Sequence, residues 1–319
     1  MKILITGGLG FQGVHLASAL IRAGHDVTLL NTMSADAQTN LGHLKASFVT
    51  LDQAPIYQVV WGSVTDPEIV RKTVFGQRRI IHLAAWASVD LSFVEPAAAL
   101  HVNVLGTYNV LEAVRLRNRQ ARVVVASSCE VYGDTGGNPA IRQSPEFTPL
   151  MPHSPYAATK AAADRLAYAY RMTYDLDITI VRPANVYGPY QRSGMGGAVI
   201  PIMVDAAVAG LPITVTGDGL QTREYLHVDD LVRGYLAILD GPSGVYNLGT
   251  GEIVTIQSIA ERIAATFGVP IEHVVGRPGE VQGFRLDSMR MAMLHGFMPR
   301  ISFADGLLSY LAWRKSQAT

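Results

Sequence analysis

The chain begins Met1-Lys2-Ile3-Leu4-Ile5-Thr6-Gly7-Gly8-Leu9-Gly10-Phe11-Gln12-Gly13, and this stretch decides the fold. Lys2 to Thr6 has the apolar character of a buried strand, and helical spacing follows from Val14 to Ala23. Between them, Gly7, Gly10 and Gly13 have the spacing Gly-x-x-Gly-x-x-Gly. Glycines there let backbone N–H groups and the positive end of a helix approach a pyrophosphate. The stretch predicts a dinucleotide site; a turn that serves packing alone is the alternative.

Short runs rich in Val and Ile alternate with helical stretches along the first half of the chain. Continuous apolar strands that alternate with helices indicate a parallel sheet covered on both faces. We predict an α/β fold with a doubly wound parallel sheet over residues 1–182 and a smaller C-terminal lobe over 183–319, with a strand near 245–248 returning to the main sheet. The expected strands are 2–6, 27–30, 79–83, 122–126 and 178–181, and the expected long helices are 97–116 and 156–174.

The composition excludes several classes of protein. Lys plus Arg and Asp plus Glu both number 26, so the formal charge is zero and nothing favours a nucleic-acid or anionic membrane partner. One cysteine excludes a disulfide framework, and an apolar fraction of 49% excludes disorder. No targeting segment, membrane span or metal-ligand spacing is visible, so we expect a cytoplasmic protein without a metal site.

The second strand should end in the residue that contacts the adenosine ribose, and here this residue is Asn31. An acidic side chain at this place selects NAD, because it accepts a hydrogen bond from the 2′-hydroxyl. Asn can bond the ribose but does not repel a 2′-phosphate. No Arg or Lys follows before Lys45, so a 2′-phosphate would also lack a partner, and we predict NAD in preference to NADP.

Tyr156 and Lys160 stand four residues apart on an expected helix and therefore share one face. An ammonium beside a phenol favours the phenolate and lowers its pKa, so the pair could take a proton from a sugar hydroxyl. Ser128 follows the strand that ends at Ala126, at the edge where α/β sheets bind ligands. Its hydroxyl could hold the reacting oxygen.

At this point the chain resembles the extended short-chain dehydrogenase/reductases, the NAD-dependent epimerase/dehydratases of nucleotide sugars. The resemblance covers nearly the whole chain and implies a Rossmann-type fold. Its marks are the glycine motif, His82-Leu83-Ala84-Ala85, Asn103 with Gly106-Thr107, Ser128 with Val131-Tyr132-Gly133, Tyr156 with Lys160, Arg182-Pro183-Ala184-Asn185-Val186-Tyr187-Gly188-Pro189, Arg223 before Tyr225-Leu226-His227-Val228-Asp229-Asp230, and Arg277-Pro278-Gly279.

The resemblance implies roles for individual residues. Ser128, Tyr156 and Lys160 would be the catalytic triad, and Asn185, Arg223 and Arg277, together with Ser128, would bind the nucleotide-sugar substrate. Ser63 stands where the family commonly has Asp near the adenine. The residues expected to contact NAD are Gly7, Gly10, Phe11, Gln12, Gly13, Asn31, Ser63, Val64, Leu83, Ala84, Ala85, Asn103, Tyr156 and Lys160.

The reaction that follows oxidation of the sugar at C4 depends on Cys129 and Glu130. A glutamate here resembles dehydratases and decarboxylases, where it transfers protons, and 4,6-dehydratases usually carry Asp-Glu. The thiol of Cys129, with an ordinary pKa of about 8.5, could donate a proton at pH 7, and a Cys-Glu pair resembles 5,6-dehydratases. We favour elimination of water, with 4-epimerisation and then decarboxylation as alternatives. A non-catalytic NAD-binding protein is disfavoured, because Tyr156 and Lys160 are both present.

Structural roles compete with these assignments. Cys129 could be a small apolar filler, Glu130 could bond its loop, Asn103 could tie a helix to the sheet, and Arg223 could form a surface ion pair. His82 and His227 are expected to be structural, and Asp229-Asp230 to cap a helix. Relatives pair two long helices per subunit, so the resemblance also implies a homodimer through a four-helix bundle built from the helices at 97–116 and 156–174.

Overall fold

The computed structural model describes residues 1–48, 56–134, 143–276 and 281–318. Its main sheet has seven strands, all parallel, in the order β10-β6-β5-β4-β1-β2-β3. The doubly wound α/β fold expected from the sequence is confirmed. The strands are β1 (Lys2–Thr6), β2 (Asp26–Asn31), β3 (Tyr57–Trp61), β4 (Arg79–His82), β5 (Arg122–Ala126), β6 (Ile178–Pro183) and β10 (Val245–Leu248).

Both faces of this sheet are buried, as its continuous apolar strands require. In β1, Ile3 and Ile5 belong to one hydrophobic cluster, which includes residues of helices α1, α2 and α9, while Leu4 belongs to the other, with residues of α3, α6 and α7. The helices of the two layers are α1 (Phe11–Arg22), α2 (Ala35–Ala46), α3 (Pro67–Val74), α6 (Gly106–Arg117), α7 (Pro155–Tyr174) and α9 (Val228–Ile238).

The long helix expected at 97–116 is divided by a wide turn. It consists of α5 (Pro96–Leu100), a π-helical turn at His101–Leu105 and α6. The π turn holds Asn103, whose side chain leaves the helix to bond two other segments described below. Single π turns inside α-helices are frequent at functional sites. A π turn contains one residue more than an α-helical turn, and the apolar spacing of this stretch did not predict it.

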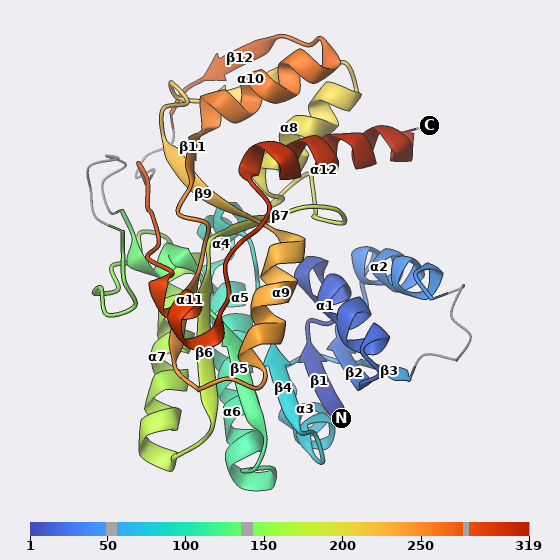
Figure 1. Ribbon diagram of the computed structural model, residues 1–319, viewed down its shortest axis with the longest axis vertical. Coiled ribbons are helices and arrows are strands. Elements are labelled where there is room, and N and C mark those ends of the chain that lie inside the picture. Colours follow the sequence, from blue (N-terminus) through green and yellow to red (C-terminus); the bar gives the residue numbers. More distant parts are fainter. Residues whose placement is uncertain (49–55, 135–142, 277–280, 319) are drawn as a thin grey trace.

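The C-terminal lobe lies beyond one end of the main sheet, away from the N-terminus (Figure 1). It has its own cluster of buried apolar residues and two small sheets, β11-β9-β7 and β12-β8. Its chain also supplies β10 and α9 to the main layers, so the predicted division at residue 182 stays a prediction. Helix α11 (Met289–His295) also lies against the main sheet, where it packs on β10. The remaining elements of the lobe are β7 (Asn185–Tyr187), α8 (Val199–Val208), β8 (Ile213–Thr216), β9 (Thr222–His227), β11 (Ile253–Thr255), α10 (Ile256–Phe267), β12 (Ile271–Val274) and α12 (Phe303–Ala318).

Two short elements complete the fold and both lie beside the site. Helix α4 (Val89–Val94) follows β4, and a single 3-10 turn, η2 (Cys129–Tyr132), follows β5. The expected loop at 135–155 lies outside the described residues from 135 to 142, and from residue 143 on it runs to the start of α7. Among the described residues no helix is both long and apolar enough to cross a membrane.

Candidate active site

A cleft of about 1240 Å³ runs from the glycine loop to the C-terminal lobe. One wall is formed by residues at the ends of strands β1, β2, β4 and β5 of the main sheet. The opposite wall is formed by the C-terminal lobe. The predicted residues that line it are Gly10, Phe11, Gln12, Asn31, Ala85, Ser128, Cys129, Glu130, Tyr156, Asn185 and Arg223. Gly7, Gly13, Ser63, Val64, Leu83, Ala84, Asn103 and Lys160 lie outside that lining. Arg277 lies outside the described residues.

The glycine loop packs too closely for any side chain. A Cβ on Gly13 would lie 2.3 Å from the Gly7 carbonyl oxygen, and Gly7 has φ +70° and backs onto Ala84. The first helical bond of α1 runs from Val14 N to Gly10 O (2.9 Å), so the N–H groups of the first turn are left for a ligand. A cradle of this form suits a pyrophosphate, and the residues present fit NAD.

Two carboxamides fix this loop from behind. Asn31 Oδ1 accepts from Leu9 N (3.1 Å), and Asn40 Nδ2 donates to Leu9 O (2.9 Å). The Asn31 Nδ2 also donates to Thr32 O (2.9 Å). Asn31, which the sequence assigned to the ribose, therefore braces the phosphate loop as well as lining the cleft. Asn40 was missed, because nothing in a local pattern ties α2 to Leu9.

Three predicted NAD residues lie behind the cleft lining and contact neighbouring segments of the protein: Ser63, Val64 and Asn103. Ser63 Oγ bonds Thr65 Oγ1 (2.7 Å), and Val64 packs on Gly106, whose Cβ would lie 2.6 Å from it. Asn103 accepts from Trp86 N (2.7 Å) and donates to Thr159 Oγ1 (2.9 Å). It therefore ties the segment after β4 to the helix that carries Tyr156 and Lys160, which is close to the structural role considered for it, and its contact with NAD stays a prediction.

His82 belongs to a buried chain of hydrogen bonds that can be resolved completely. Thr107 Oγ1 donates to Asn103 O (2.6 Å), so it accepts from His82 Nε2 (3.0 Å). His82 Nδ1 then accepts from Thr6 Oγ1 (2.6 Å). This arrangement needs a neutral imidazole, and burial with the nearby Lys160 lowers the His82 pKa to about 3. His82 is structural, as expected.

Tyr156 and Lys160 start helix α7, whose first turn is capped by Ser154 Oγ accepting from Ala157 N (3.1 Å). Lys160 is 6% exposed and its ammonium donates to the Ala126 carbonyl. Burial lowers the Lys160 pKa to about 8, although Asp164 opposes the shift. Tyr156 differs from expectation: burial and the Glu130 charge raise its pKa, and only a bond with Ser128 opposes them. Lys160 alone therefore does not lower the Tyr156 pKa, contrary to the expectation from the sequence.

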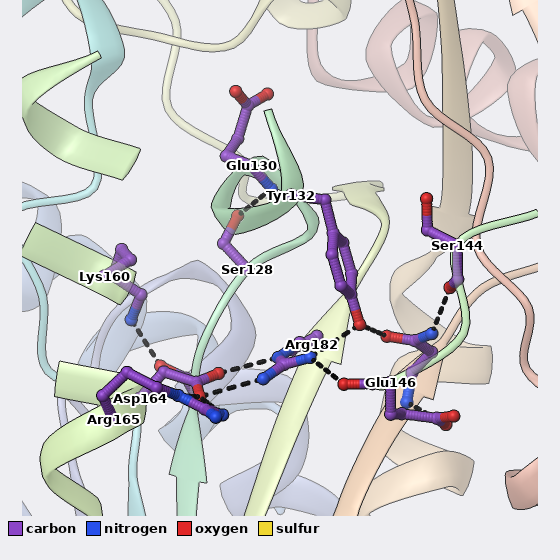
Figure 2. Close-up of polar contacts among 11 residues, drawn as sticks. Ser128, Glu130, Tyr132, Ser144, Glu146, Lys160, Asp164, Arg165 and Arg182 are labelled. Atoms are coloured by element: carbon purple, nitrogen blue, oxygen red, sulfur yellow. Dashed lines mark hydrogen bonds and ion pairs between the residues drawn. The ribbon is translucent and has the colours of Figure 1, made fainter. Parts of the chain in front are cut away.

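Ser128, Cys129 and Glu130 follow β5 in the turn η2. Ser128 Oγ caps this turn by accepting from Glu130 N (3.2 Å). Figure 2 shows the Glu130 carboxylate directed away from the buried ion pairs around Arg182. Burial raises the Glu130 pKa, while Arg223 and His153 lower it. Cys129 is only 1% exposed, and burial raises the pKa of its thiol well above the usual value.

Two of the predicted substrate residues, Asn185 and Arg223, reach the cleft from the lobe. Asn185 Nδ2 donates to Glu224 O (3.2 Å), and Arg223 donates to the carbonyls of Thr222 (2.8 Å) and Val281 (2.9 Å). Two neutral carbonyl partners leave the charge of Arg223 available to an anion. Among the cleft residues that the sequence analysis did not single out is His153, which stands three residues before Tyr156 and whose charge acts on Glu130.

The family model of the NAD-dependent epimerase/dehydratases matches residues 3–249. The chain belongs to this family. It is 36% identical to a dTDP-glucose 4,6-dehydratase of Streptomyces niveus, over 98% of this chain and 92% of the relative. It is 33% identical to a UDP-glucose 4-epimerase of Mycolicibacterium smegmatis, over 96% of each.

Solved structures agree with this placement. The dTDP-glucose 4,6-dehydratase DesIV of Streptomyces venezuelae, with NAD and TYD bound, has a TM-score of 0.89 at 31% identity and covers 99% of this chain and 97% of its own. The UDP-glucose 4-epimerase of Thermotoga maritima, with UDP-glucose, has a TM-score of 0.88 at 27% identity and full coverage of both. The chain is therefore an NAD-dependent nucleotide-sugar epimerase/dehydratase, and NAD is its cofactor.

Proposed function

We propose that the enzyme is a nucleotide-sugar dehydratase, which oxidises the sugar at C4 and then eliminates water across C5 and C6. Glu130 carries this proposal. It stands two residues after Ser128, lines the cleft beside Tyr156, and has a pKa raised by burial. A carboxylate of raised pKa at the sugar is a suitable base for the acidic C5 proton next to a C4 ketone.

NAD supplies the hydride acceptor for C4. The chain's own groups manage the protons and the orientation. Tyr156 takes the proton of the C4 hydroxyl, Ser128 holds that oxygen, and Lys160 contributes a positive charge on the same helix face. We assign the nucleotide diphosphate to Asn185, Arg223 and Arg277, because a guanidinium suits a diphosphate better than an ammonium does.

4-Epimerisation is the second candidate. It is favoured by the similarity to the two UDP-glucose 4-epimerases named above and by Cys129, which stands where dehydratases usually have Asp. An epimerase needs no base at C5, so Glu130 would then transfer no proton and would only place a charge near Arg223 and His153. Decarboxylation of a uronic acid is the third outcome of the test below.

The test is incubation with a panel of nucleotide sugars, starting with dTDP-glucose, UDP-glucose and UDP-glucuronate, followed by mass spectrometry. Loss of one water supports the proposal. Unchanged mass with an altered NMR coupling pattern at C4 would instead identify an epimerase, and loss of carbon dioxide a decarboxylase. Glu130→Gln should abolish loss of water while the first oxidation at C4 persists.

We also propose a cytoplasmic homodimer that pairs α5–α6 and α7 of each subunit. These helices carry large apolar side chains that the single chain leaves exposed, which is unusual unless another surface covers them. They are Leu100, Leu105, Tyr108, Leu116, Tyr168 and Met172, exposed by 38–62%. Light scattering at micromolar concentration tests this, and a monodisperse monomer would refute it.

A further inference from the structure

His153 is held against the turn that carries Glu130. Met151 N donates to Val131 O (3.1 Å), so the segment leading to α7 runs along η2. Gly133 ends that turn with φ +71°. A Cβ on Gly133 would lie 1.8 Å from Met151 O and 3.1 Å from Cδ2 of His153. Only glycine allows this approach, which brings the imidazole up to the turn.

The same side chain remains open to the cleft. His153 is exposed and lines the cleft together with Ser128, Glu130 and Tyr156. It directly precedes Ser154, the residue that caps α7. The capped start of the helix therefore sets the position of the His153 backbone relative to Tyr156. Its charge also reaches the carboxylate, because His153 lowers the Glu130 pKa against the effect of burial.

Elimination of a hydroxyl group needs a proton donor as well as a base, because hydroxide is a poor leaving group. Cys129 was the donor expected from the sequence, but its side chain is 1% exposed and packs in a hydrophobic cluster of the main domain. An exposed imidazole is better placed to reach a substrate. Imidazole is the side chain that most often donates or accepts a proton in general acid–base catalysis.

We propose that His153 is the general acid of the elimination; this rests on the dehydratase function proposed above. In this step Glu130 takes the proton from C5, and the C5–H electron pair forms the C5–C6 double bond. The C6–O bond breaks, and the proton of His153 passes to the leaving oxygen. The products are the 4-keto-5,6-ene and one water, with Glu130 protonated and His153 neutral.

The experiment compares His153→Asn with Cys129→Ala in the full-length enzyme, on the nucleotide sugar from which the wild type removes water. Three quantities are measured: loss of water by mass spectrometry, formation of reduced nicotinamide by absorbance, and uptake of solvent deuterium at C5. Loss of the acid should lower the rate of water loss by about 10²–10⁴-fold. Oxidation and C5 deuterium uptake should stay near wild type, since Tyr156 and Glu130 are intact. Cys129→Ala removes the rival proton donor, and its rate of water loss should fall much less than that of His153→Asn.

A substrate with fluorine at C6 separates an acid from a structural residue. Fluoride leaves with little help from a proton, so this substrate should restore elimination to His153→Asn but not to Glu130→Gln. The proposal would be overturned if His153→Asn lost water at the wild-type rate. It would also be overturned if only Cys129→Ala showed a large fall in the rate of water loss. Loss of oxidation together with elimination in His153→Asn would also overturn it, because the residue would then serve the shape of the site. If wild type removes water from no sugar, the dehydratase function itself fails.

Discussion

The ion pair between Asp164 and Arg182 is fully buried behind the catalytic residues (Figure 2). Both side chains are 0% exposed, and Arg182 bonds the carboxylate through Nε (2.8 Å) and Nη2 (3.0 Å). The remaining donor contacts Tyr132 Oη (2.8 Å) and the Glu146 carbonyl (2.9 Å). Asp164→Asn keeps the shape but leaves the guanidinium without a countercharge. Removing one partner of a buried pair costs about 3–5 kcal/mol, and we expect a loss of that size in the free energy of unfolding.

The same substitution acts on Lys160, one helical turn before Asp164. Burial lowers the Lys160 pKa to about 8, and the Asp164 charge works against that shift. Without this charge the pKa falls further, so less of the lysine is protonated at neutral pH. A pKa of about 8 leaves roughly ten charged lysines per neutral one at pH 7, and each further unit reduces that ratio tenfold. The alkaline decline of the rate should therefore begin at lower pH in Asp164→Asn.

Urea unfolding and a pH–rate profile measure the two effects. The matched control is Arg165→Ala, which removes the other arginine on the same carboxylate. The Arg165 side chain is 48% exposed, and exposed ion pairs contribute about 0–1 kcal/mol. An unfolding free energy of Asp164→Asn within about 1 kcal/mol of the wild type would refute the stability argument. An unmoved alkaline limb would refute the coupling to Lys160.

Three further predictions follow from single residues. Tyr156→Phe should lower turnover by about 10²–10⁴-fold with the fold intact, because the proton acceptor for C4 is lost; a steady-state rate near wild type would contradict the triad. Gly13→Ala should lose NAD binding in calorimetry, since its Cβ would lie 2.3 Å from Gly7 O, whereas Gly42→Ala in α2, with nothing within 4 Å, should bind NAD normally. Burial lowers the pKa of His82 from 6.5 to about 3, so its contribution to stability is complete above pH 6.5 and is lost as pH falls towards 3; His82→Asn should flatten the pH dependence of the unfolding midpoint in that window.

Features that depend on residues close together in the sequence were predictable from the sequence. The strand, glycine turn and helix at the N-terminus follow from local spacing, and so does the start of α7, where Ser154 caps and Pro155 begins the helix. The π turn at His101–Leu105 was not predictable, because it depends on the bonds of Asn103 to Trp86 and Thr159 in distant segments. The same holds for Asn40 and Leu9.

The direction of side chains in a tight turn explains why Glu130 is a stronger candidate for proton transfer than Cys129. The sequence sets both directly after Ser128, as equal candidates for proton transfer. In a 3-10 turn successive side chains point about 120° apart, so adjacent residues are exposed to the cleft to different degrees. Both residues line the cleft, but the Cys129 side chain is only 1% exposed and packs in the hydrophobic cluster of the main domain, whereas the Glu130 side chain is partly exposed. A second proton-transfer group must then come from another segment that passes the same turn, and His153, fixed there by Gly133 and Met151, meets that requirement.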